Sequence, residues 1–177
     1  SSGGALVRTD DGFRITESGG AALGDRARFS GAVDALAAEE LDAAIESFET
    51  LSADLPTRAA PRVNLGIALR AADRLSEAEA VLLEAVAIHP RHVVAHNELG
   101  IVYRKLGRLD ESRRSYERAI ALYSDFHFAH RNLGILCDLF LEDARCALSH
   151  YRRYLEIVPD DERVAMWIAD LEQRASE

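Results

Sequence analysis

Apolar residues recur every three or four positions along most of the chain, which is the spacing of one face of an α-helix. In the stretch HNELGIVYRKLGRLDE they fall at Leu99, Val102, Tyr103 and Leu106, and this pattern predicts a helix. Gly100 lies in the middle of that stretch, where glycine costs a helix roughly 1 kcal/mol relative to alanine. We therefore expect a packing requirement that offsets this cost.

The glycine recurs at a fixed interval. The motifs NLGIAL, ELGIVY and NLGILC place Gly66, Gly100 and Gly134 at intervals of 34 residues. A small residue follows each glycine further along the chain, and a large apolar or aromatic residue comes four positions after it, as in Ser112 and Tyr116. A period of this size is typical of a helical repeat array. The pattern predicts two closely packed helices in each unit, glycine against small residue, with burial offsetting the lost helix propensity.

A weaker copy of the motif precedes these three, with Ala32 at the glycine position. We therefore predict an all-α fold of four antiparallel helix pairs. Their ranges are 25–58, 59–92, 93–126 and 127–161. The fourth pair carries one extra residue, which we place in the turn DLFLED.

A further helix is predicted after Pro159, within residues 162–177, with Asp160 or Asp161 as its N-cap. Its apolar residues share one face of the helix. They are Val164, Trp167, Ile168 and Leu171. An open-ended array of helix pairs needs such a terminal helix to cover its last apolar surface, so we interpret residues 162–177 as a capping helix and tail.

The first 24 residues are rich in Gly, Ser and Asp, and we predict a flexible N-terminal segment, 1–24. Within it, GFRITE alternates apolar and polar residues as an exposed strand does. The stretch ESGGAALG would tether this segment to the helices. Because ordering the segment costs as much as burying Phe13 and Ile15 would gain, we expect them to dock only with a partner or in a dimer.

The chain has 177 residues, 48% of them hydrophobic, and a formal charge of −9. This length supports one domain with a sizeable core. The acidic balance argues against binding to nucleic acid or anionic membranes, and no run of about 18 apolar residues predicts a membrane span. All basic residues but Lys105 are arginine, and alanine is abundant, which suggests a bacterial protein. The chain lacks an initiator methionine, so we expect a processed or trimmed form. We prefer the periplasm or envelope to the cytoplasm as its location.

Residues 25–159 resemble the tetratricopeptide repeat family. The family pattern is Trp, then Leu-Gly, Tyr, Ala, Phe and Pro at set intervals. The residues that match it are Leu65, Gly66, Leu99, Gly100, Leu133, Gly134, Tyr103, Ala44, Ala78, Phe48, Pro56, Pro90 and Pro159. The Trp position departs from the pattern, because it holds Arg28, Arg62, His96 and His130.

The resemblance implies a right-handed α-solenoid in which the first helix of each pair lines a concave groove. The residues it places there combine amides, charges and an aliphatic stripe. They are Asn64, Ile67, Arg70, Asn97, Glu98, Ile101, Arg104, Arg131, Asn132 and Ile135. Asparagine both donates and accepts, as a peptide backbone requires, although its amide can equally bond a neighbouring helix.

Some family members clamp a C-terminal carboxylate with lysine, asparagine and arginine at set groove positions. Here those positions hold Phe29 and Val33 in the first unit, and Val94 and Glu98 in the third. Only Asn64 fits, so we reject this clamp.

Two sets of residues have the types found in metal or redox sites. His92 and His96 have the i, i+4 spacing of metal ligands, but no cysteine or carboxylate completes a set, so we predict no metal site and no cofactor. Cys137 and Cys146 fall in the two helices of the fourth pair. We expect buried thiols there, with a disulfide as the alternative if the Cα atoms lie within about 7 Å.

No combination of side chains indicates catalysis. We therefore predict a non-catalytic scaffold that binds a protein or peptide segment in the groove, within a bacterial multiprotein assembly. One alternative is an accessory segment of a larger enzyme. The other is a structural module that forms a homo-oligomer through its groove or its N-terminal segment.

Overall fold

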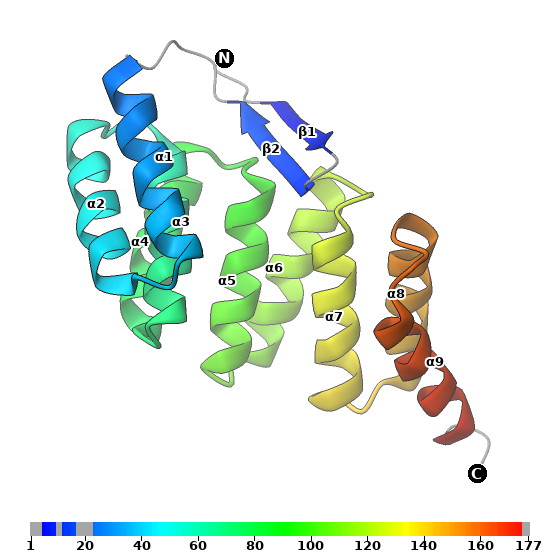
Figure 1. Ribbon diagram of the computed structural model, residues 1–177. Coiled ribbons are helices and arrows are strands. Elements are labelled where there is room, and N and C mark those ends of the chain that lie inside the picture. Colours follow the sequence, from blue (N-terminus) through cyan, green and yellow to red (C-terminus); the bar gives the residue numbers. More distant parts are fainter. Residues whose placement is uncertain (1–4, 10–11, 17–22, 175–177) are drawn as a thin grey trace. The chain divides into compact units, whose positions relative to one another are not determined.

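The structure is a computed structural model that describes residues 5–9, 12–16 and 23–174. From Leu23 onward this part of the chain is a succession of nine α-helices (Figure 1). They are α1 (Leu23–Ala37), α2 (Leu41–Asp54), α3 (Ala59–Ala71), α4 (Leu75–Ile88), α5 (Val93–Lys105), α6 (Leu109–Leu122), α7 (His127–Leu139), α8 (Ala144–Ile157) and α9 (Glu162–Arg174).

The helices belong to two compact units, residues 1–95 and 96–177, and the boundary falls within α5. In the first unit α1 packs on α2, α2 on α3 and α3 on α4. In the second unit α6 packs on α7, α7 on α8 and α8 on α9. The two helices of each pair run antiparallel, as the pairs α3–α4 and α7–α8 show in Figure 1. The prediction of an α-solenoid with four helix pairs and a final helix is confirmed.

The described part of the N-terminal segment is a β-hairpin. Strand β1 (Ala5–Thr9) pairs antiparallel with β2 (Gly12–Thr16), so that Ala5 lies opposite Thr16 and Thr9 opposite Gly12. The strand-like alternation of GFRITE coincides with β2, whereas its pairing with residues 5–9 was not predicted. The tether expected at residues 17–24 lies mostly outside the described residues, as do the last three residues of the C-terminal tail. Flexibility of this segment and docking of Phe13 and Ile15 stay predictions.

The repeated glycines are positions of close helix contact. A Cβ atom added to Gly100 would overlap the ring of Tyr116, which is fully buried on α6. The Ser112 hydroxyl, also on α6, donates a hydrogen bond of 2.7 Å to the carbonyl oxygen of Gly100. Gly134 has the same relation to Tyr151, since a Cβ there would lie 2.5 Å from the ring. The close approach that the sequence predicted is thus the reason for glycine inside these helices.

The turns within the helix pairs repeat as regularly as the glycines do. Three residues separate the helices in the first three pairs, and the middle one has a positive φ: Glu39 (60°), Asp73 (59°) and Gly107 (74°). In the fourth pair four residues, 140–143, separate α7 from α8, and the positive φ falls at Glu142 (52°). The extra residue predicted for this turn is confirmed.

The two cysteines form a disulfide, so the expectation of free thiols is wrong. Cys137 on α7 and Cys146 in the first turn of α8 have their Cα atoms 5.8 Å apart. Tight packing of this helix pair brings the two residues within bonding distance, which their spacing in the sequence alone does not establish. Asp143 caps α8 by accepting a hydrogen bond of 3.0 Å from the Cys146 backbone N–H.

The last helix covers the apolar end of the second unit. Val164 and Leu171 of α9 are buried in the core shared with α7 and α8. Asp161 is the N-cap, because its carboxylate accepts hydrogen bonds from the backbone N–H of Val164 (3.2 Å) and from the Tyr154 hydroxyl (2.8 Å). This hydroxyl group also lowers the pKa of Asp161.

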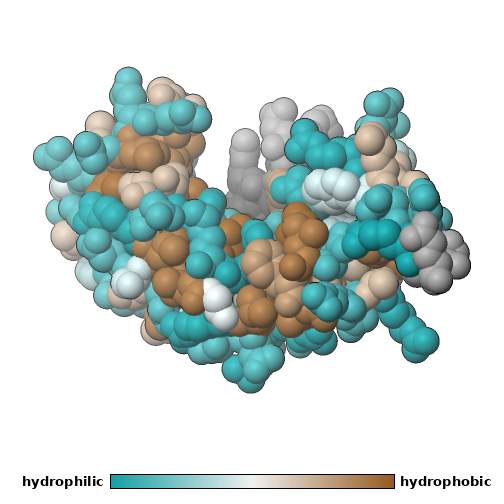
Figure 2. Space-filling model, turned by 90° about the horizontal axis from the view of Figure 1, so that it is seen from below, coloured by the Kyte–Doolittle hydropathy of each residue, from teal (hydrophilic) through white to brown (hydrophobic). Residues whose placement is uncertain are grey.

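Large apolar side chains are also exposed on the surface. Figure 2 shows hydrophobic residues gathered in groups among hydrophilic ones on the face seen from below. In the first unit the exposed fraction of Leu83 on α4 is 46%. In the second unit Leu139 and Phe140, at the turn between α7 and α8, are 67% and 43% exposed. These side chains are available for contact with another molecule.

Candidate functional site

The groove residues predicted in the first unit all lie on α3 and are half-buried. They are Asn64, Ile67 and Arg70. The side-chain amide of Asn64 donates a hydrogen bond of 2.9 Å to the carbonyl oxygen of Ala60, one turn earlier in the same helix. No hydrogen bond to the amide oxygen of Asn64 is present among the described residues, so that oxygen can accept a hydrogen bond from a partner.

In the second unit the predicted amides bond to each other. The Asn132 amide on α7 donates to the side-chain oxygen of Asn97 on α5 over 3.0 Å. Asn97 in turn donates to the Glu98 carboxylate over 3.3 Å, and all three residues are buried. Asn132 therefore joins two neighbouring helices, which is the structural role that the sequence left open for it. A peptide that binds here would have to use donor or acceptor atoms that take no part in this hydrogen-bond network.

The isoleucine that follows each repeated glycine is more exposed than the leucine that precedes it. Leu65, Leu99 and Leu133 are buried. Ile67, Ile101 and Ile135 are half-buried at the corresponding position of three repeats. The leucines thus fill the core, while each isoleucine keeps part of its apolar surface in contact with solvent.

Arg104 is a half-buried cation on α5. Its guanidinium lies 5.5 Å from the centre of the Phe140 ring, and it has no ion pair among the described residues. The buried Tyr116 hydroxyl also lacks a hydrogen bond within the described part of the molecule. Burial raises the pKa of Tyr116, and the nearby Arg104 opposes that rise. A carboxylate or carbonyl oxygen from a partner would give Arg104 the acceptor it lacks.

Arg131 lies between two aromatic rings. Its guanidinium is 5.8 Å from the centre of the Phe128 ring and 5.8 Å from that of Tyr154. Cation–π contacts of this kind hold a planar guanidinium in place, which favours its use in recognition.

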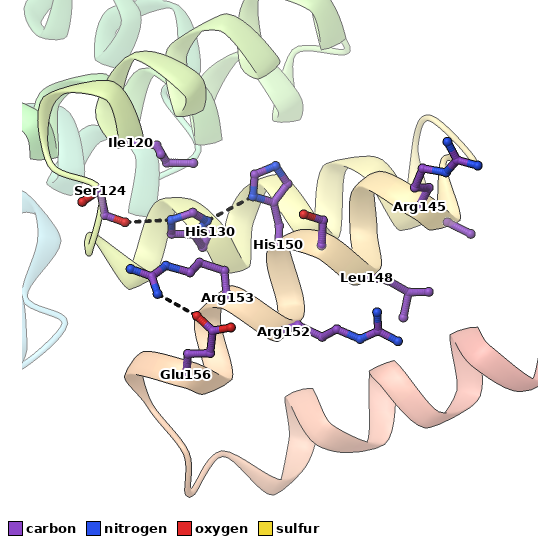
Figure 3. A pocket seen from close by; sticks show the side chains of 11 residues that line it. Ile120, Ser124, His130, Arg145, Leu148, His150, Arg152, Arg153 and Glu156 are labelled. Carbon is purple, nitrogen blue, oxygen red and sulfur yellow. Dashed lines mark hydrogen bonds and ion pairs between the residues drawn. The ribbon is translucent and has the colours of Figure 1, made fainter.

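A second candidate site, which the sequence did not predict, is an open pocket of about 910 Å³ lined by side chains of α6, α7 and α8 (Figure 3). Its lining combines apolar residues, arginines and two histidines. The residues are Ile120, Ser124, His130, Ala144, Arg145, Leu148, Ser149, His150, Arg152, Arg153 and Glu156. None of the ten predicted groove residues is among them.

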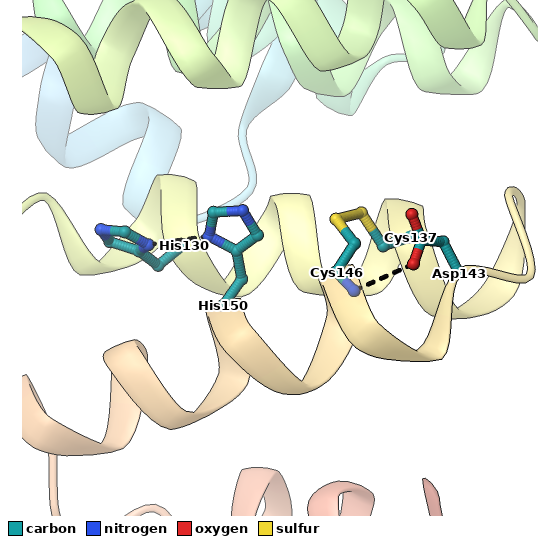
Figure 4. The surroundings of a disulfide bond; sticks show 5 residues. All are labelled: His130, Cys137, Asp143, Cys146 and His150. Atoms are coloured by element: carbon teal, nitrogen blue, oxygen red, sulfur yellow. Dashed lines mark hydrogen bonds between the residues drawn. A yellow bond between two sulfur atoms is a disulfide. The ribbon is translucent and has the colours of Figure 1, made fainter. Parts of the chain in front are cut away.

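Two histidines of this pocket are hydrogen-bonded to each other. The Nδ1 atoms of His130 and His150 are 3.0 Å apart, and Nε2 of His130 lies 3.0 Å from the Ser124 carbonyl oxygen. His130 must donate from Nε2 to that oxygen, so its Nδ1 accepts and Nδ1–H of His150 donates. The pair lies on the same helix pair as the disulfide (Figure 4). The contact of Gly134 with Tyr151 fixes how α7 and α8 align along their lengths. The repeat pattern that contains this contact could have predicted that His130 and His150 lie close together.

The pKa values of both rings are lowered, which favours their neutral forms. Burial lowers the pKa of His130. Burial, His130 and the charge of Arg113 together lower the pKa of His150 to about 4.

His92 and His96 have the sequence spacing of metal ligands, but we predicted no metal site there. In the structure His92 has a different role. Nδ1 of His92 accepts a hydrogen bond of 3.2 Å from the backbone N–H of Ala95 at the start of α5. Among the described residues, no group of three or more His, Cys, Asp or Glu side chains could hold a metal ion. In that same part of the chain, every helix is too short or too polar to cross a membrane.

These features define the class of protein: a helical repeat protein whose helix pairs recur every 34 residues around glycine contacts. Two family models described as tetratricopeptide repeat match residues 35–90 and 91–160. The chain belongs to the tetratricopeptide repeat family, and the resemblance seen in its sequence is confirmed. A search of curated protein sequences finds no match to the chain.

Solved structures with this fold come from several bacteria. A tetratricopeptide repeat protein of Thermus thermophilus, TTC0263, is 26% identical with a TM-score of 0.76, over 84% of this chain and 81% of that one. The pilF protein of Pseudomonas aeruginosa is 18% identical with a TM-score of 0.79, over 86% and 69% of the two chains. MamA from Desulfovibrio magneticus RS-1 is 15% identical with a TM-score of 0.73, over 88% and 87%. The last two likenesses show the fold alone.

Proposed function

We propose that the chain is a non-catalytic scaffold that binds an extended segment of a protein partner along the first helices of its pairs. The family's fold supports a protein-interaction scaffold in general. The more specific proposal, that the partner binds in the groove, rests on the half-buried isoleucines Ile67, Ile101 and Ile135. Three half-buried aliphatic side chains at one repeat position offer apolar contacts spaced along a chain of repeats.

Polar groups beside the isoleucines fit a peptide. The amide oxygen of Asn64 is unbonded within the described residues, and Nε of Arg104 lacks a hydrogen-bond partner there. A peptide backbone supplies an N–H for the first and a carbonyl or carboxylate oxygen for the second. This chemistry requires no cofactor and no bond cleavage.

The proposal is tested by quantitative affinity capture from extracts of the source organism. We expect the variant Ile67→Glu/Ile101→Glu/Ile135→Glu to lose the specific partner, because each glutamate replaces apolar contact surface with charge. The control Leu83→Glu places a single glutamate on an exposed leucine of α4, and it should retain the partner, as the three single isoleucine variants with the same added charge should not. Circular dichroism must show the same helicity for all variants. Loss of the partner from the control and not from the isoleucine variant would overturn the groove assignment.

Self-association is a second candidate, favoured by the hairpin. The described sheet has two strands only, so β1 and β2 each present one unpaired edge to which another strand could add. Light scattering of the purified chain tests this role: a mass that falls to one chain when Arg14→Pro disrupts β2 would support it, and a single-chain mass before that change would exclude it.

A further inference from the structure

We propose that the pocket between α6 and α8 binds an acidic segment of a protein partner, with a carboxylate at its arginines and an aliphatic side chain on its apolar floor. This site is separate from the proposed groove, because it shares no residue with it. An experiment can therefore contradict the proposal for the pocket without contradicting the proposal for the groove, and the reverse.

The floor of the pocket is apolar. Ile120 of α6 and Ala144 and Leu148 of α8 line it, and all three are half-buried. Each of them keeps part of its apolar surface exposed to solvent at the pocket. A volume of about 910 Å³ has room for more than one side chain. An occupant that covered this floor with an aliphatic group would gain the free energy of removing both surfaces from water.

The rim of the pocket is basic, although the whole chain carries a charge of −9. Arg145, Arg152 and Arg153 line it, against a single carboxylate, Glu156. Arg153 is the most fully paired of them, because it contacts two carboxylates, Glu156 at 2.6 Å and Asp125 at 2.5 Å.

The other two arginines of the rim are available for an anion. Arg152 pairs with Glu172 of α9 at 2.5 Å, but both side chains are about half exposed, and such pairs are weak and exchange readily with other anions. Arg145 has no ion pair among the described residues. The rim therefore offers one unpaired and one weakly paired guanidinium.

His150 is a half-buried titratable residue of the pocket lining. Burial is the main reason why a charge on its ring is disfavoured, and His130 of α7 and the charge of Arg113 of α6 add to that effect. The charges near His130 are those of Arg153, which opposes a proton on its ring, and of Asp125 and Glu156, which favour one. Since Nδ1–H of His150 donates to His130, its Nε2 carries the lone pair that would take up a proton. A carboxylate in the pocket would stabilise that proton, so ligand binding and protonation of His150 favour each other.

The apolar floor selects the class of occupant. An inorganic anion would contact the arginines and leave Ile120 and Leu148 in water, whereas an acidic segment with an aliphatic residue would cover both. The lining residues include no Phe, Tyr or Trp side chain on which a nucleic acid base could stack, and the rings of His130 and His150 are bonded to each other. A protein segment that alternates acidic and aliphatic residues satisfies the floor and the rim together.

The test uses the full chain labelled with ¹⁵N and the peptide Ac-Leu-Glu-Leu-Glu-NH₂ as probe. We expect amide shifts confined to the pocket residues of α6 and α8, with a dissociation constant of about 5 mM or below, as for a short flexible ligand. The neutral peptide Ac-Leu-Gln-Leu-Gln-NH₂ and inorganic phosphate should each bind at least tenfold more weakly. The pKa of His150, followed by its ring proton shifts, should rise with the acidic peptide present.

Variants locate the binding site. Arg145→Ala/Arg152→Ala should weaken binding of the acidic peptide at least tenfold, while the control Arg118→Ala removes an exposed arginine of α6 outside the pocket and should leave binding unchanged. Leu148→Ser should weaken binding of the acidic peptide and leave that of phosphate unchanged. Absence of binding, equal binding of phosphate, or equal affinity of the double arginine variant would each overturn the proposal. A change in partner capture by the groove variants bears only on the groove.

Discussion

At the scale of single residues, each repeated glycine lowers the helix propensity of its segment but allows two helices to pack closely. Gly100→Ala should lower the free energy of unfolding by about 1–3 kcal/mol, because the new methyl group would overlap the rigid, fully buried ring of Tyr116. Gly66→Ala should cost less, since its neighbour is the more adaptable side chain of Leu82. Urea denaturation at neutral pH measures both.

Gly31 is the matched control for these changes. It lies in α1 with no atom within 4 Å of an added Cβ. Gly31→Ala should therefore raise stability by about 0.5–1 kcal/mol through helix propensity alone. A Gly100→Ala protein as stable as the parent chain would contradict the role of close helix contact.

The histidine pair predicts a loss of stability on acidification. The pKa of His150 is lowered from its usual 6.5 to about 4, so between these values the unfolded chain binds a proton that the folded chain does not. The stabilisation is complete above pH 6.5 and is lost as the pH falls towards 4. We expect a contribution of roughly 1–2 kcal/mol, discounted for solvent screening of this half-buried ring.

Denaturation midpoints at pH 7 and pH 4.5 measure this effect. His150→Gln should lose less stability over that interval than the parent chain, while both share the response of the carboxylates. The same decrease in both proteins would show that the histidine pair does not contribute.

At the scale of elements, the disulfide joins α7 and α8 across the longest of the helix-pair turns. Cys137 and Cys146 are 9 residues apart, and closing so short a loop in the unfolded chain stabilises the folded state by about 2–3 kcal/mol. Reduction should lower the melting temperature of the parent chain accordingly. Calorimetry with and without a reductant measures the shift.

Cys137→Ala/Cys146→Ala is the control for reduction. Its melting temperature should be low and should not respond to the reductant. Mass measurement of the unreduced protein from its source would separately establish whether the bond forms there, since disulfides persist in oxidising compartments. Two free thiols in that protein would leave α7 and α8 joined by packing alone.

At the scale of the whole molecule, contacts in the described helices run mainly between neighbours in the chain. Stability in such an array is approximately a sum of repeat and neighbour terms. Phe48→Ala removes a fully buried ring of α2 that packs edge-to-face on Phe29. Hydrogen exchange should increase strongly in α1–α3 and little in α7–α9. A uniform increase along the chain would instead indicate a single cooperative unit.

The features that the sequence predicted correctly are local and periodic. The spacing of Gly66, Gly100 and Gly134 predicts the helix pairs, and the apolar face that follows Pro159 predicts the final helix, because each depends on a few residues within one unit. The aspartates after Pro159 likewise predicted Asp160 or Asp161 as the N-cap of α9, and Asp161 is that residue. Such signals need no knowledge of how distant residues meet.

What the tertiary structure alone decided is which side chains meet. Asn132 bonds Asn97 rather than solvent, and the disulfide forms between helices whose spacing in the sequence allowed thiols as well. The pocket gathers residues from three helices, with His130 and His150 separated by 20 positions. These contacts depend on the distance and angle between packed helices. That geometry results from the packing of the whole core, and the pattern of apolar residues in each helix does not specify it.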